Sequence, residues 1–218
     1  NSKIPLLVTS DFENGCGSMV RALTPLPFMM GLGATADPDL AYDYGKATAL
    51  EALSIGANWT FSPVSDLNRN RRNPLINNRG MTDDAELGAK MLPQIIRGMQ
   101  DNGLSACAKH FPGDGMDYRD QHITTTYNSC DMDDWRATYG KVFAATIAAG
   151  VDSIMAGHIG LPRENLFGRI EQLQDQCVQR LLIRIELIIL LTEEILAGNG
   201  IGLSQCIVTV ILLQTAQD

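Results

Sequence analysis

The sequence predicts an α/β fold built on a parallel sheet, and three observations support this prediction. Apolar runs rich in β-forming residues alternate with longer stretches of helical periodicity, as in successive βαβ units. The runs end in polar or ionisable residues, which is where such folds place their chemistry. No repeat and no Pro/Ser/Gly-rich tract divides the chain, so residues 1–218 are expected to form a single domain.

Four strands are expected in the first part of the chain: Pro5 to Ser10, Asn58 to Val64, Leu104 to Phe111 and Val151 to Gly157. In a βα-repeat fold the carboxyl ends of the strands meet at one face, so the residues that follow them converge there. The residues expected to line one pocket for this reason are Asp11, Asp66, Lys109, His110 and His158.

Three helices are expected between these strands: Asp39 to Ile55, about Asp84 to Gln100, and Asp133 to Ala149. The first has apolar residues broadly on one face. The second begins with acidic residues, which suit the positive N-terminal end of a helix. The third is closed by Gly150, a residue type common just after helix ends.

The pattern changes after Pro162. Arg163 to Leu196 is predicted to be an amphipathic or mostly buried helix, and Cys206 to Leu213 a last strand. The longest apolar stretch, Leu181 to Leu191, contains two charged residues and is too short to cross a bilayer. We therefore expect this stretch to belong to the core and not to a membrane span.

Charge and cysteine content narrow the classes of partner. Twenty-five acidic against seventeen basic residues give a net charge of −8, which argues against nucleic acid and anionic membranes and favours a neutral small molecule. Five scattered cysteines show no CxxC pair and no metal-ligand spacing, which argues against a disulfide framework and a zinc site. No metal and no other cofactor is predicted. This cysteine usage favours a reducing compartment such as the cytoplasm. The N-terminal residues show no targeting pattern, so a targeting segment is expected to be either absent or removed.

The most informative segment is Lys109 to Gly115, followed within a few residues by Asp120 to His122. It places a cation, two of the three histidines and two glycines at the end of a strand. A fixed Lys-His pair can hold sugar hydroxyls, and a histidine on a glycine-hinged loop can carry a proton to a leaving group. The alternative interpretation is a polar turn with one buried histidine.

Other polar residues have defined expectations. Asp120 is a suitable partner for His122, because a carboxylate bonded to imidazole fixes its tautomer, provided that the backbone turns between them. Asp11 and Asp66 are expected to accept hydrogen bonds from hydroxyls, with helix capping or loop-orienting hydrogen bonds as the alternative. Arg79 is expected to clamp a carboxylate or an amide carbonyl, with a solvated arginine as its alternative.

At these residues the sequence resembles glycoside hydrolase family 3, specifically its β-N-acetylglucosaminidases with a histidine acid/base. The matching motifs are Pro5 to Asp11, Met30 to Thr35, Asn58 to Asn68, Asn73 to Arg79, Lys109 to Gly115 and Asp120 to His122. The resemblance implies a TIM-type barrel without a cofactor, in which Asp11, Arg79, Lys109 and His110 bind the terminal sugar. It also implies that Asp120 and His122 form the acid/base dyad of a retaining reaction with a covalent glycosyl-enzyme intermediate.

The sequence departs from the family pattern in three places. The family's nucleophile is an aspartate at the end of a later strand, and Val210 occupies that position here. Met19 replaces a family arginine, with Arg21 nearby. Residues 1–162 match well whereas residues 163–218 diverge, so the resemblance implies an incomplete barrel. We interpret the divergent part as the product of a truncated or frameshifted reading frame.

Two alternatives stay open. The missing nucleophile favours a catalytically inactive carbohydrate-binding homologue or a gene fragment. A β-glucosidase of the same family is the other alternative, although such enzymes typically take their acid/base from a glutamate outside the barrel.

Overall fold

The computed structural model describes residues 6–160 and 210–212 of the chain. Four strands lie parallel in chain order: β1 (Thr9–Ser10), β2 (Trp59–Thr60), β3 (Cys107–Phe111) and β5 (Ser153–Ala156). β1 pairs with β2, and β3 pairs with β5. Parallel bridges from Trp59 to Ser105 and from Val64 to Lys109 join the two pairs. The strands therefore form one continuous parallel arc, as the βαβ pattern predicts.

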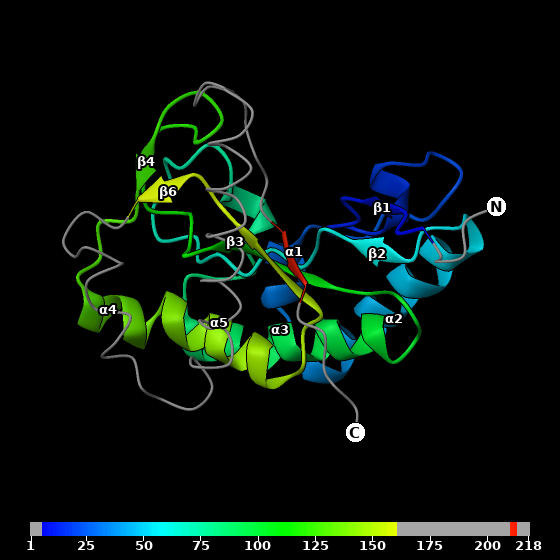
Figure 1. Ribbon diagram of the computed structural model, residues 1–218. Helices are drawn as coiled ribbons and strands as arrows, with labels where there is room; N and C mark the ends of the chain where they lie inside the picture. The colour runs from blue at the N-terminus through cyan, green and yellow to red at the C-terminus, as the bar shows by residue number, and fades with distance from the viewer. Residues whose placement is uncertain (1–5, 161–209, 213–218) are drawn as a thin grey trace.

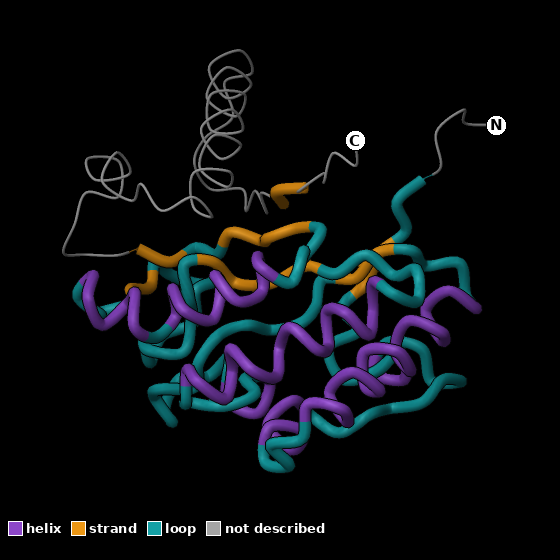
Figure 2. The backbone as a smooth tube through the Cα atoms, turned by 90° about the horizontal axis from the view of Figure 1, so that it is seen from below, coloured by secondary structure: helices purple, strands orange, loops and turns teal. Residues whose placement is uncertain are grey.

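Helices cover one side of this arc (Figures 1 and 2). They are α2 (Pro38–Ser54), α3 (Ala85–Gln100), α4 (Met132–Ala137) and α5 (Tyr139–Ala148), preceded by the short α1 (Met29–Gly33). α3 packs between α2 and α5, so the helices follow the order of the strands. This is the arrangement of successive βα units in a barrel wall.

Side-chain caps explain where the two long helices begin. Asp37 accepts hydrogen bonds from the first backbone N–H groups of α2, and Asp84 does the same for α3. Pro38 follows the first cap at a position that needs no N–H donor. Both predicted helices are confirmed within about one residue at either end.

The core lies between the helices and the sheet. α3 contributes the largest share, with Met91, Leu92, Ile95 and Ile96 at most 1% exposed. Gly45 of α2 is in direct contact with the backbone of α3, where any Cβ atom would collide with a carbonyl oxygen. The two helices therefore approach each other more closely than larger side chains would allow.

Three expectations about elements need correction. The helix expected from Asp133 to Ala149 is two helices, because the backbone at Thr138 leaves the helical region, with φ −118° and ψ −95°. All four parallel strands are shorter than expected, and β2 is short because Pro63 lacks the N–H that a longer ladder needs. The last strand, β7 (Val210–Leu212), pairs antiparallel with β5, so it does not continue the parallel arc.

Two short strands were not predicted: β4 (Thr126–Tyr127) and β6 (Ile159–Gly160), which pair with each other in parallel. The expected helix from Arg163 to Leu196 and the apolar stretch from Leu181 to Leu191 lie outside the described residues. Within residues 6–160 and 210–212, no helix is long and apolar enough to cross a membrane.

Candidate active site

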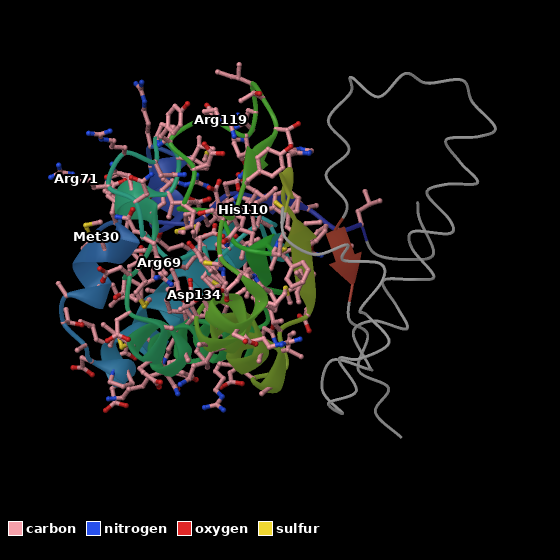
Figure 3. All side chains as sticks on the ribbon, turned by 90° about the vertical axis from the view of Figure 1, so that its left-hand side faces the viewer. Met30, Arg69, Arg71, His110, Arg119 and Asp134 are labelled. Carbon is pink, nitrogen blue, oxygen red and sulfur yellow. The ribbon has the colours of Figure 1, made fainter. Side chains whose placement is uncertain are left out.

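A pocket of about 710 Å³ opens at the carboxyl ends of the parallel strands. The sequence predicts a binding or acid/base role for seven residues at the strand ends or in the loop after β3. Five of them line the pocket, and Asp66 and Asp120 do not. Arg79, from a 3-10 turn, lines it as well. In Figure 3 His110 lies inside the molecule, whereas Arg119 lies near the outer end of the loop that follows β3. The residues with polar side chains that line the pocket are Asp11, Glu13, Asn14, Arg79, Lys109, His110, Gln121, His122 and His158.

Lys109 is the buried cation of the pocket. Its side chain is only 3% exposed, and its Nζ lies 2.6 Å from Asp11 Oδ1 and 2.6 Å from Glu13 Oε1. Burying a charge is costly unless it is paired, and the two carboxylates provide that pairing. Asp11 is nearly half exposed, so its carboxylate is oriented by Lys109 and still accessible from the pocket.

Arg79 clamps a carboxylate, as expected, and that carboxylate belongs to Glu13. Its Nε and Nη2 each lie 2.7 Å from a different oxygen of Glu13, which is the bidentate geometry that guanidinium favours. Burial opposes the charge on Glu13, but hydrogen bonds from Arg79 and the nearby charge of Lys109 outweigh it and lower the pKa of Glu13 to about 2. Glu13 is therefore ionised near neutral pH.

Asp66 lies behind the pocket. Its side chain is fully buried and accepts hydrogen bonds from the backbone N–H groups of His110 and Asp114. One of its oxygens also lies 2.7 Å from His110 Nδ1. This favours the loop-orienting alternative over direct binding of hydroxyls. If His110 Nδ1 carries the proton, Nε2 is the acceptor that the ring presents to the pocket.

Asp120 and His122 are in contact, as the sequence predicts. The backbone turns so that Asp120 Oδ1 lies 2.8 Å from both the backbone N and the Nδ1 of His122. The backbone N–H bond to this oxygen lowers the pKa of Asp120, despite some desolvation, and the imidazole contributes in the same direction. His122 lines the pocket and Asp120 supports it from outside, so the ring can exchange protons with a molecule bound there.

His158 lines the pocket, and its backbone N–H donates to Gln121 Oε1 at 2.9 Å. The Nε2 of the same glutamine donates to Asp114 Oδ2 at 2.7 Å. Asp114 is 3% exposed, and burial together with the charge of Asp66 raises its pKa. These contacts join the ends of β3 and β5 to the loop that carries His122.

Sequence reasoning missed Glu13 and Gln121. Glu13 lies two residues after Asp11, and this spacing places polar side chains at the same strand end. Nothing local distinguishes Gln121, because its partners come from two other segments. In the described part of the chain, no group of three or more potential ligand side chains has the geometry of a metal site.

Comparison with known proteins places the chain in a family. Residues 1–166 match the model of the glycosyl hydrolase family 3 N-terminal domain. The chain is 40% identical over 159 residues to a β-N-acetylglucosaminidase/β-glucosidase of Cellulomonas fimi, covering 73% of this chain and 28% of that protein. It is 34% identical over 166 residues to a β-hexosaminidase of Stenotrophomonas maltophilia (strain R551-3), covering 73% of this chain and 49% of the relative. The chain thus spans about half the length of these relatives or less.

Solved structures agree with this assignment. The β-glucoside phosphorylase BglX bound to 2FGlc superimposes with a TM-score of 0.70 at 36% identity, covering 80% of this chain and 32% of that one. A family 3 β-N-acetylglucosaminidase from Paenibacillus sp. str. FPU-7 gives a TM-score of 0.66 at 33% identity, covering 73% and 30%. These neighbours confirm the predicted incomplete TIM-type barrel. The chain belongs to glycosyl hydrolase family 3, and residues 1–166 correspond to the N-terminal domain of that family.

Proposed function

We propose that the protein removes terminal β-linked N-acetylglucosamine, or a related sugar, by retaining glycoside hydrolysis. The observation that carries the proposal is the contact between Asp120 and His122 beside a pocket that also contains Lys109 and His110. The relatives from Cellulomonas fimi and Stenotrophomonas maltophilia, whose names include this activity or hexosaminidase activity, support it.

In the proposed complex, the terminal sugar lies against the strand ends. Asp11 accepts a hydrogen bond from a sugar hydroxyl. Lys109 orients the carboxylate of Asp11, and Arg79 orients that of Glu13. His110 accepts from a second hydroxyl through Nε2, because Asp66 holds its Nδ1. His158 completes the binding groups at the end of β5. Fixed groups of this kind position a substrate without paying an ordering cost during the reaction.

His122 is the proposed acid/base. It donates a proton to the glycosidic oxygen as the bond from that oxygen to the anomeric carbon breaks, and then takes a proton from the water that attacks the same carbon. Asp120 stabilises the imidazolium form and fixes the ring. The covalent intermediate between these steps requires a carboxylate nucleophile. Among the described residues, the two carboxylates that line the pocket, Asp11 and Glu13, are both paired with Lys109. Val210, at the position of the family nucleophile, has no carboxylate.

That observation favours a second candidate, a carbohydrate-binding homologue without turnover. Valine has no group that attacks an anomeric carbon, so a chain that relies on Val210 binds the sugar and leaves the bond intact. A phosphorylase that uses phosphate in place of water is a third candidate, because one of the superimposed structures is named a β-glucoside phosphorylase. A family 3 β-glucosidase differs from the proposed enzyme in its preferred sugar, which is glucose and not N-acetylglucosamine.

The test is release of 4-nitrophenol from 4-nitrophenyl N-acetyl-β-glucosaminide, compared with the β-glucoside and repeated with added phosphate. We expect release from the N-acetylated substrate, and His122→Ala to lower kcat by about 10²- to 10⁴-fold, the usual contribution of general acid/base catalysis. Release that is unaffected by His122→Ala would contradict the proposal. Binding of N-acetylglucosamine by calorimetry without release would support the second candidate, and release that depends on phosphate the third.

A further inference from the structure

Gln121 is a buried polar side chain in an otherwise exposed loop. It is 6% exposed, whereas the apolar Ile123 is 84% exposed and Tyr118 is 68% exposed. A loop that buries its glutamine and exposes its isoleucine is not organised by the hydrophobic effect. The buried amide must therefore be satisfied by specific partners, and those partners determine where the loop lies.

The amide of Gln121 uses both of its ends. Nε2 donates to Asp114 Oδ2 at 2.7 Å, and Oε1 accepts from the backbone N–H of His158 at 2.9 Å. Asp114 is itself fixed, because its other oxygen accepts from Asn73 and from the backbone N–H of Gly115. One side chain thus connects the loop to the ends of β3 and β5.

We propose that Gln121 is a positioning residue for the adjacent dyad, and that its two hydrogen bonds hold His122 over the pocket. The proposal rests on the proposed function for the role of His122. Gln121 lies between Asp120 and His122 in the chain. Hydrogen bonds that hold the Gln121 side chain in place therefore also restrain the backbone of the two residues beside it. His122 is 62% exposed at its side chain, so contacts of its own ring do not fix the loop.

The pair Gln121 and Asp114 permits an exchange of donor and acceptor. Gln121→Glu places two acceptors against each other, and Asp114→Asn places two donors against each other, so each single variant breaks the contact. The double variant restores it, because the amide introduced at position 114 then donates to the carboxylate introduced at position 121, which still accepts from the backbone N–H of His158. Gln100→Ala is the matched control, since Gln100 makes the same two-ended contact with Gly150 and Asp152, remote from the pocket.

Two measurements on the full chain test the proposal. Hydrogen exchange of residues 116–126 should accelerate about tenfold in each single variant, the effect of losing one to two net hydrogen bonds, and return to the wild-type rate in the double variant. The NMR signals of the His122 ring should shift in the single variants and return to their wild-type positions in the double variant. Gln100→Ala should change neither measurement.

Turnover provides the functional readout. Proton donation matters most for poor leaving groups, and kcat/KM reports the step in which the leaving group departs. Each single variant should therefore lower kcat/KM about tenfold for an alkyl glycoside and less than about threefold for a 2,4-dinitrophenyl glycoside. Unchanged loop exchange in both single variants, or failure of the double variant to restore it, would overturn the proposal. If the double variant restores the wild-type exchange rate but the wild-type protein hydrolyses no glycoside, the role of the Gln121 hydrogen bonds in holding the loop is supported and the proposed function is refuted.

Discussion

The charge of Glu13 gives the sharpest test of the electrostatics in the pocket. The pKa of this carboxyl falls from an ordinary 4.5 to about 2, because the hydrogen bonds from Arg79 and the charge of Lys109 outweigh desolvation. Each pKa unit corresponds to about 1.4 kcal/mol, so ionised Glu13 stabilises the folded state by about 3 kcal/mol. The Glu13 side chain is only 13% exposed, so solvent screening reduces this stabilisation only slightly.

The sign of the pH dependence follows from the direction of the shift. A carboxyl with a lowered pKa in the folded state contributes its full stability above about pH 4.5 and loses it as the pH falls towards about 2. Glu13→Gln should therefore lower the free energy of unfolding by about 3 kcal/mol near pH 7, and the difference from the wild type should shrink between pH 4.5 and 2.

Urea denaturation of the full chain at a series of pH values, followed by fluorescence of its two tryptophans, measures this difference. Asp133→Asn is a suitable control, because Asp133 is 96% exposed at its side chain and its contact with Arg136 lies on the surface. Equal pH profiles for wild type and Glu13→Gln would refute the reasoning.

Two further perturbations test the cluster and the loop. Lys109→Met keeps the side-chain volume but removes the cation that pairs with Asp11 and Glu13. Urea denaturation at neutral pH should show a loss of about 2–4 kcal/mol in the free energy of unfolding, and an unchanged midpoint would contradict the pairing. Gly115→Ala should cost at least about 2 kcal/mol, because φ is 103° and a Cβ would collide with the Leu67 carbonyl. Gly150→Ala has a positive φ but open space around it, so a loss of only about 1 kcal/mol is expected, and equal losses at the two glycines would argue against the collision.

Local patterns account for much of what the sequence predicts correctly. The cap at Asp84 and the apolar face of α3 lie within one segment, so periodicity and capping are sufficient to place that helix. The contact between Asp120 and His122 spans two residues, which a single turn of backbone can close. The motif from Lys109 to Gly115 likewise identifies the family from contiguous residues, and the family match confirms it.

Local patterns fail where a distant partner decides the outcome. The antiparallel direction of β7 depends on how it meets β5, which no property of its own residues specifies. Asp66 could cap, orient or bind by its residue type alone, and only the approach of His110 and Asp114 selects orientation.

By itself, the sequence determined the alternation of strands and helices, the strand-end positions of the candidate site and the family of the chain. Tertiary structure decided the pairing of Arg79 with Glu13 and the tie between Gln121 and Asp114. The physical reason is that a parallel sheet collects side chains from separate strand ends at one edge. Hydrogen bonds and charges then act across distances of a few ångströms between residues that are far apart in the chain.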